Sequence, residues 1–258
     1  MKLGIAYNVF DGAEHLKNSI ELVSLCADFI CIVAQDVSNF GEPAPAWTKE
    51  LVEEAGLMVD HVVYVKPIKA GGHNNELWKR NIGRSACLDA GCTHFMTMDA
   101  DEYYVPEQLE AAKRAVEKGG YDSSSCQMQT YYGDPEHALD PPEDYHVPLI
   151  YRMDNREFEM GVKFPVNADP TRKMQPGKFV AFERDKIEMH HFSYLRKDIR
   201  LKLRNSSASS NFKDRIEKIS EYYDSWEHGK DALLAGRGER FYNLRGVENQ
   251  FFIQWEKK

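Results

Sequence analysis

Residues 93–104 read Thr-His-Phe-Met-Thr-Met-Asp-Ala-Asp-Glu-Tyr-Tyr, and this stretch decides how the first half of the chain is interpreted. Its apolar part, residues 94–98, predicts a buried strand. Asp99 and Asp101 follow directly, and the bend that ends a strand can turn two carboxylates at i and i+2 toward one point. Such a pair suits a hard divalent cation, Mg²⁺ or Mn²⁺. An aspartate-rich turn or a helix cap is the alternative interpretation.

Other apolar runs precede this stretch and alternate with segments of helical period. Strands are predicted over residues 3–7, 29–35 and 61–65, and helices over residues 14–26, 47–55 and 75–90. Strands that alternate with crossover helices predict an α/β fold, with a mostly parallel sheet and helices on both faces. Because ligands gather at the carboxyl ends of such strands, we expect the site where Asp99 and Asp101 lie.

The chain changes character after a predicted helix over residues 107–118. Short strands are predicted over residues 125–131, 147–153, 179–182 and 187–191, and they indicate an antiparallel, loop-rich portion. Residues 197–205, 212–228 and the tail from 247 are predicted to be helical or capping segments. We therefore expect one catalytic domain over residues 1–205, with halves at 1–120 and 121–205, and a helical C-terminal extension over 206–258 that packs on it.

The composition is that of an ordinary globular protein, with 258 residues, 42% hydrophobic and 29% charged. The net charge of −8 gives no general attraction to nucleic acid or to an anionic membrane. The 5 cysteines are odd in number and lack metal-type spacing, which predicts buried free thiols. Without a long apolar stretch or a signal-peptide pattern, a cytoplasmic chain with no transmembrane anchor is expected.

The segment Asp99-Ala100-Asp101-Glu102, placed after an apolar strand in an α/β half, resembles the DxD motif of GT-A glycosyltransferases, most closely the family 2-like group. Supporting similarities cover residues 1–205 and lie at 5–8 (Ile-Ala-Tyr-Asn), 79–83 (Lys-Arg-Asn-Ile-Gly), 151–152 (Tyr-Arg) and 190–196 (His-His-Phe-Ser-Tyr-Leu-Arg). The resemblance implies a Rossmann-like GT-A sheet with a smaller antiparallel acceptor portion. It also implies a metal-dependent enzyme that moves a sugar from a nucleoside-diphosphate sugar to a hydroxyl acceptor, whether glycan, protein, lipid or modified DNA base.

The resemblance also implies roles for individual residues. It assigns the nucleoside to Tyr7, Asn8 and Asp36, and the Mn²⁺ or Mg²⁺ ion to Asp101, Asp99 and His191, with Asp99 shared by the donor site. The aligned run favours His191 over His190, and side-chain alternation in a strand lets only one of the two face the site. Mixed carboxylate and imidazole ligation suits Mn²⁺. Arg80 and Arg196 are the expected partners of the diphosphate, because a guanidinium binds phosphate in a bidentate manner.

The general base is the least defined part of the prediction. Related enzymes often carry a His-Glu pair that residues 158–165 lack, so Asp169 and Glu183 remain as candidates. Arg196, Arg200 and Arg204 would share one helix face, which could bind an anionic acceptor or simply be solvated. Two other functions stay open: a nucleotidyltransferase or other phosphodonor enzyme, and a non-catalytic module that binds glycan or nucleic acid.

Overall fold

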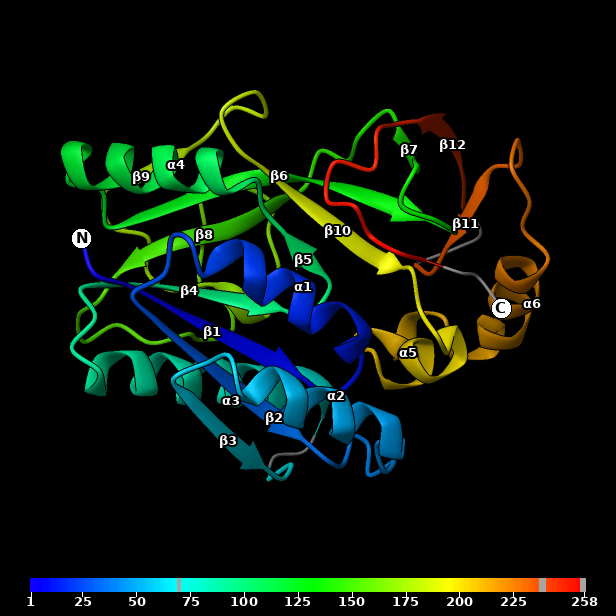
Figure 1. The fold of residues 1–258 in the computed structure, drawn as a ribbon, viewed down its shortest axis with the longest axis horizontal. Helices are drawn as coiled ribbons and strands as arrows, with labels where there is room; N and C mark the ends of the chain where they lie inside the picture. Colours follow the sequence, from blue (N-terminus) through cyan, green and yellow to red (C-terminus); the bar gives the residue numbers. More distant parts are fainter. Residues whose placement is uncertain (69–70, 237–239, 256–258) are drawn as a thin grey trace.

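The computed structural model describes residues 1–68, 71–236 and 240–255, and within them the chain forms an α/β fold around one sheet of 12 strands. The sheet order is β11-β12-β7-β6-β8-β4-β1-β2-β3, and β5, β9 and β10 branch from this path (Figure 1). Its parallel part consists of β1 (Leu3–Val9), β2 (Phe29–Gln35), β3 (His61–Val65) and β4 (His94–Asp99). The prediction of a parallel first half is therefore confirmed.

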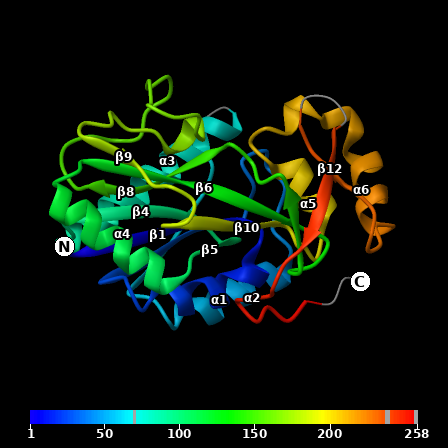
Figure 2. The same ribbon diagram turned by 90° about the horizontal axis from the view of Figure 1, so that it is seen from above.

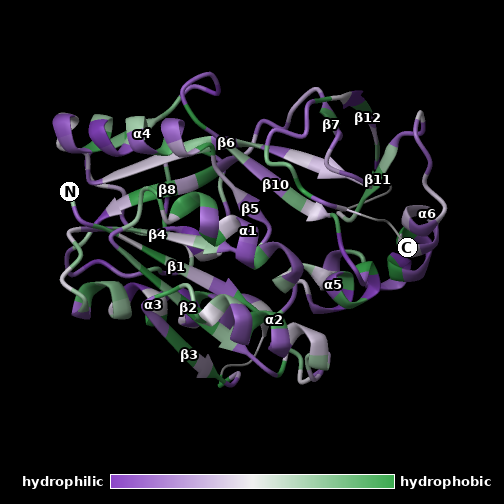
Figure 3. Cartoon of the chain, viewed as in Figure 1, coloured by the Kyte–Doolittle hydropathy of each residue, from purple (hydrophilic) through white to green (hydrophobic). Residues whose placement is uncertain are grey.

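Helices cover both faces of the parallel strands, as predicted. They are α1 (Ala13–Val23), α2 (Ala46–Gly56), α3 (Gly72–Asp89) and α4 (Pro106–Gly119). Figure 2 shows α1 and α2 on one side of the sheet and α3 on the other. Hydrophilic and hydrophobic residues alternate along α1 and α4 (Figure 3), as expected for helices with one face on a sheet.

Successive side chains of β1 point to opposite faces of the sheet, so they pack against different helices. Leu3, Ile5 and Tyr7 belong to a core with residues of α1, α2 and α4, whereas Ala6 packs with residues of α3 in a second cluster. Helix α3 lies very close to the strands, because a Cβ added to Gly83 would lie 2.5 Å from the Cβ of Ala6. This close approach holds the polar residues of α3 near the ends of β1 and β4.

The second half continues the same sheet and is mixed in direction, so the prediction of an antiparallel portion is only partly correct. Its strands are β5 (Glu102–Tyr103), β6 (Ser123–Tyr132), β7 (His137–Asp140), β8 (His146–Arg152), β9 (Phe179–Ala181) and β10 (Glu188–Tyr194). Strand β8 is antiparallel to β4 and β6, but β9 and β10 run parallel to β6. Direction depends on long-range pairing, which the alternation of a single strand does not encode.

The C-terminal segment is not purely helical, which corrects the expectation for residues 206–258. Helices α5 (Ile199–Asn205) and α6 (Ile216–Asp224) are followed by strands β11 (Ala232–Leu234) and β12 (Arg240–Gly246). Strand β12 pairs with β7 and so extends the sheet. The helices and strands of this segment bury an apolar cluster that includes Leu203, Phe212, Ile219 and Trp226. An exposed edge at β7 explains the strands, since an unpaired edge favours further pairing.

The state of the cysteines and the length of the helices were also predicted from the sequence. All five cysteines are buried and free, which confirms the interpretation of their spacing. Within the described ranges, no helix combines the length and the apolar character needed to cross a bilayer.

Candidate active site

A polar cavity of about 270 Å³ opens at the carboxyl ends of β1 and β4. This volume is slightly below the ~300 to 1,000 Å³ that is usual for small-molecule sites. Strand ends, α3, β10 and α5 all contribute to its walls. The charged and amide side chains that line it, together with one imidazole, are Asn8, Asp11, Asn39, Glu76, Lys79, Asp99, Asp101, Asp169, His191, Arg196, Lys202 and Asn205.

Neighbouring residues of β1 divide between this cavity and the core. Asn8 lines the cavity and its amide donates to Thr97 Oγ1 at 3.2 Å. Tyr7 is fully buried on the other face, where its hydroxyl bonds to Ser19 at 2.8 Å. Because side chains of a strand alternate, only one of the pair can face the cavity. The structure therefore places Asn8, and not Tyr7, where a ligand can reach it.

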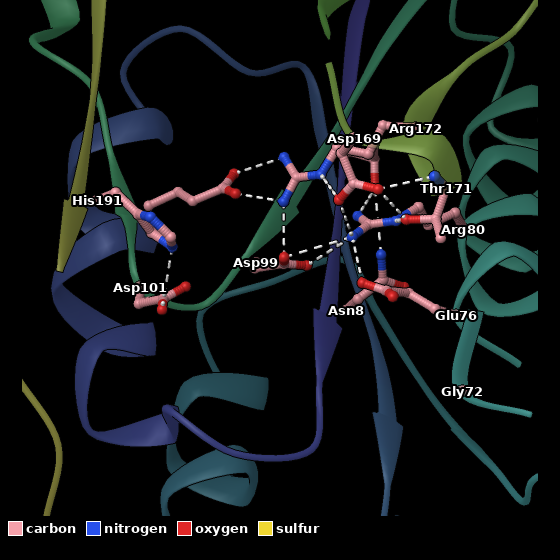
Figure 4. Close-up of polar contacts among 12 residues, drawn as sticks. Asn8, Gly72, Glu76, Arg80, Asp99, Asp101, Asp169, Thr171, Arg172 and His191 are labelled. Carbon is pink, nitrogen blue, oxygen red and sulfur yellow. Dashed lines mark hydrogen bonds and ion pairs between the residues drawn. The ribbon is translucent and has the colours of Figure 1, made fainter. Parts of the chain in front are cut away.

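Asp99 is held by two buried guanidinium groups. Its carboxylate accepts from Arg172 Nη2 at 2.6 Å and lies 3.3 Å from Arg80 Nη2 (Figure 4). Arg172 also binds Glu102, which is 1% exposed, with 3.0 Å from Nη1 to Oε2. Arg80 itself is 0% exposed and does not line the cavity. Arg80 thus lies behind Asp99 and positions that carboxylate.

Asp101 has different partners, which all come from the chain around β10. Its Oδ2 accepts a hydrogen bond from Arg196 Nη2, and it lies 3.5 Å from His191 Nε2. The second ring nitrogen of His191, Nδ1, is buried and has no hydrogen-bond partner within the described part of the chain. His190 points to the other face of β10, where Tyr131 Oη lies 2.8 Å from its Nδ1. Of the two histidines, His191 is the one beside Asp101.

The basic partners keep both motif aspartates ionised. Burial acts to raise the pKa of each carboxyl, but Arg172 and Arg80 outweigh it and lower the pKa of Asp99. At Asp101 burial is outweighed by Arg196 and His191, which hold its pKa well below the ordinary value. Both side chains are therefore carboxylates at neutral pH, the form that binds cations.

The predicted metal ligands are not gathered around one point. Asp101 and His191 adjoin each other at the cavity wall, so this pair fits a divalent cation. Asp99 is bound to Arg172 and Arg80 instead. Among the residues that the structure describes, the group Asp99, Asp101 and His191 does not bring its ligand atoms within 4.8 Å of one another. A full DxD ligand set thus requires Asp99 to exchange its contacts with Arg172 and Arg80, and Asp101 to exchange its contact with Arg196.

The remaining predicted residues lie in different surroundings. Asp169 lines the cavity, and its Oδ1 accepts from the Thr171 N–H at 2.7 Å and the Thr171 hydroxyl at 2.8 Å. Asp36 and Glu183 are exposed and do not line the cavity. Their positions follow from local geometry, because one directly follows β2 and the other lies in the turn before β10. The structure brings neither to the site.

Several functional candidates escaped the sequence analysis. Lys79 and Lys202 both line the cavity, and burial lowers the pKa of each to about 8. Asp11 and Glu76 also line the cavity, and burial raises the pKa of both carboxyls. Arg172 ends a single 3-10 turn, Pro170–Arg172, which is too short for a periodic pattern to show which way its side chain points. For Glu76 the sequence offers one weak indication of a role at the site, which is its position on α3 one helical turn before Arg80.

Arg196, Arg200 and Arg204, which were predicted to share one helix face, do not form a surface of unpaired positive charges. Arg196 precedes α5 and is buried against Asp101. Arg200 pairs with Asp224 at 2.6 Å, and Arg204 pairs with Glu42 at 2.8 Å. Each of the three guanidinium groups therefore has an acidic partner in the protein.

The fold and the cavity together define an α/β protein with a polar site at the carboxyl ends of parallel strands.

No protein-family model and no curated protein sequence matches this chain. Among solved structures, residues 1–349 of S. aureus TarS share 13% identity, with a TM-score of 0.49 over 87% of this chain and 73% of that one. S. aureus TarS in complex with UDP-GlcNAc shares 16% identity, with a TM-score of 0.40 over 56% and 38%. A mannose-1-phosphate geranyltransferase from Thermus thermophilus shares 10% identity, with a TM-score of 0.33 over 60% and 51%.

Replacing Arg172 by alanine is expected to lower the free energy of unfolding by about 3 to 5 kcal/mol, because it leaves the buried Glu102 without its counter-charge and Asp99 with Arg80 alone. Arg152 is the matched control, since its partner Asp122 is 3.1 Å away but the Arg152 side chain is 56% exposed. Arg152→Ala should cost less than about 1 kcal/mol. Urea unfolding measures both values, and equal losses would show that the Arg172 network does not stabilise the site.

Proposed function

We propose that the chain is a nucleotide-sugar glycosyltransferase of the GT-A type, with Mn²⁺ or Mg²⁺ as its metal and a hydroxyl acceptor. The observation that carries this proposal is the cavity itself. It combines ionised carboxylates, one imidazole and three cationic side chains at the carboxyl ends of β1 and β4. A nucleoside diphosphate needs this combination, because its phosphates require positive charge and its sugar requires hydrogen-bonding groups.

The cationic side chains form the proposed diphosphate site. Lys79 comes from α3, Lys202 from α5, and Arg196 from the segment that joins β10 to α5, so they reach the cavity from separate elements. Lys202 donates to the hydroxyl of Ser193, which also lines the cavity. These positive groups would stabilise the charge that develops on a departing nucleoside diphosphate. Asn8, near the end of β1, lines the cavity and would bond the nucleoside part of the donor.

Asp101 and His191 are the residues that would hold the metal. A bound divalent cation supplies Lewis-acid stabilisation of the leaving diphosphate. Asp101 is the stronger candidate, because its pKa is held well below the ordinary value and its neighbour His191 offers a nitrogen ligand 3.5 Å away. Asp99 serves to fix Arg172 and Arg80 and can join the ligand set only if those contacts are exchanged.

We assign the general base to Asp169, because it is the one of the two sequence candidates that lines the cavity. Its Oδ2 lies 4.0 Å from Arg80 Nη2 and 3.6 Å from Arg172 Nε, while its Oδ1 binds Thr171. These contacts fix the orientation of the carboxylate at the cavity wall. Asp169 would accept the proton of the acceptor hydroxyl as that oxygen attacks the sugar.

Asp101→Asn is expected to abolish the increase in nucleotide affinity that Mn²⁺ provides, because the amide removes the negative charge of the ligand. Titration calorimetry with UDP, GDP, CDP and dTDP, with and without Mn²⁺, measures this increase. Glu183→Gln, an acid outside the cavity, is the control and should behave as wild type. An unchanged Mn²⁺ effect in Asp101→Asn, with the melting temperature preserved, would contradict the assignment. Product analysis for nucleoside diphosphate against pyrophosphate separates glycosyl transfer from nucleotidyl transfer.

Nucleoside diphosphate binding without metal is expected to weaken about a hundredfold between pH 7 and pH 9, because Lys79 and Lys202, each with a pKa of about 8, each lose about nine-tenths of their positive charge in this range. The cationic form is populated below the pKa, so affinity is higher at the acidic end. The double variant Lys79→Arg/Lys202→Arg stays charged and should show a flat profile in the same titrations. A flat profile for the wild type would exclude these lysines from the diphosphate site.

Asp169→Asn is expected to lower kcat by at least about a hundredfold with little change in KM for the donor, because a general base acts on the chemical step. Thr171→Val keeps the carboxylate but removes one of its hydrogen-bond donors, and it should lower kcat by much less. Steady-state kinetics on both variants checks this expectation. Equal losses in the two variants would mean that Asp169 only positions the loop.

A further inference from the structure

A second group of metal-binding side chains lies away from the candidate active site. It consists of Asp134, His137 and His228, whose ligand atoms all lie within 4.8 Å of one another. Within the described ranges, no other group of three such residues meets this distance. None of the three lines the cavity that contains Asp99 and Asp101. The group therefore calls for an explanation separate from the proposed transferase site.

The three side chains come from two distant segments of the chain. Asp134 lies in the turn between β6 and β7, His137 begins β7, and His228 lies in the loop between α6 and β11. Asp134 Oδ1 is 2.8 Å from His137 Nδ1, and its Oδ2 is 2.8 Å from His228 Nε2. The two imidazole rings lie 4.6 Å apart between centroids and are tilted by 38°. One carboxylate thus faces two imidazole nitrogens, which are the atoms that ligate metals.

The surroundings of the group hold it in place. Trp226 contacts both rings, with centroid distances of 5.4 Å to His137 and 5.6 Å to His228. The turn itself fits tightly against this indole, because Gly133 has a φ of +79° and a Cβ added there would lie 2.2 Å from Trp226. Asp134 Oδ1 also accepts the Glu136 N–H at 2.8 Å. The carboxylate and the His137 ring are therefore oriented before any ion arrives.

Exposure leaves one side open to a ligand from solvent. The side chains of Asp134 and His137 are each 20% exposed, and that of His228 is 71% exposed. An ion can therefore enter from the His228 side, and a water molecule can complete its coordination. Two nitrogens and one carboxylate oxygen with a fourth position for water form a ligand set that suits Zn²⁺.

We propose that Asp134, His137 and His228 bind one Zn²⁺ ion. His137 would use Nδ1 and His228 would use Nε2, each as a neutral imidazole with its proton on the other nitrogen, and Asp134 would contribute a carboxylate oxygen. The ion replaces the hydrogen bonds that join the three side chains, and no covalent or redox step is involved. Since the ion would join the start of β7 to the α6–β11 loop, its binding would stabilise the C-terminal cluster around Trp226.

The test is a titration of Zn²⁺ into the full chain after metal removal with a chelator. We expect one high-affinity site and a rise in the melting temperature with Zn²⁺ concentration. Co²⁺ in place of Zn²⁺ should give the visible absorption bands of a tetrahedral site. His228→Ala, which alters an exposed side chain, should weaken Zn²⁺ affinity by at least about tenfold and remove the thermal shift, because it deletes one of three protein ligands.

Two controls separate this site from other binding. His61→Ala removes an exposed histidine on β3 and should bind Zn²⁺ as the wild type does. Asp101→Asn alters the candidate active site and should keep the high-affinity Zn²⁺ ion. Equal affinity in wild type and His228→Ala would overturn the proposal. Loss of the high-affinity ion in Asp101→Asn, with no loss in His228→Ala, would also overturn it and assign Zn²⁺ to the cavity.

Discussion

The buried ion pairs between Arg172 and the carboxylates of Asp99 and Glu102 are the interaction on which the candidate site depends. Arg172 is 3% exposed and Glu102 is 1% exposed, so neither charge is screened by bulk water. Isolated charges at such depth are very unfavourable, and their pairing fixes both partners in position. The guanidinium of Arg172 thereby connects Asp99, the first residue of the motif, to Glu102, the fourth.

The site is built from parts of the chain that meet only in the folded protein. β1 and β4 bring Asn8 and the motif aspartates, α3 brings Lys79 and Glu76, and β10 with α5 brings the histidine and the second lysine. Acidic and basic side chains both line the cavity. Because these charges are buried and close together, several cavity groups have pKa values displaced from their ordinary range, as is common where a site binds a charged ligand.

Local patterns in the sequence were sufficient for the first half of the fold and for the position of the aspartate motif. The strands Phe29–Gln35 and His61–Val65 coincide with their predicted bounds, because apolar runs between polar turns are a local signal. Which of Tyr7 and Asn8 faces the cavity depends on the register of β1 against its neighbouring strands, and this register is not a local property of the sequence. Arg172 could not be predicted, because its partner Glu102 lies 70 residues away and its own 3-10 turn, Pro170–Arg172, is too short to show a periodic pattern. Strands β11 and β12 depend on the free edge of β7, which is likewise a non-local property.

The partners of the motif aspartates have a consequence for the order in which the protein is made. Asp99 and Asp101 are synthesised well before Arg172, His191 and Arg196, and of the basic partners of the two aspartates only Arg80 precedes them in the chain. A nascent chain that has emerged only as far as α4 carries these acids without any of the three. Their mutual repulsion and their hydration then oppose closure of the turn after β4. The contacts that hold the turn after β4 can be complete only when Arg172, β10 and Arg196 have left the ribosome.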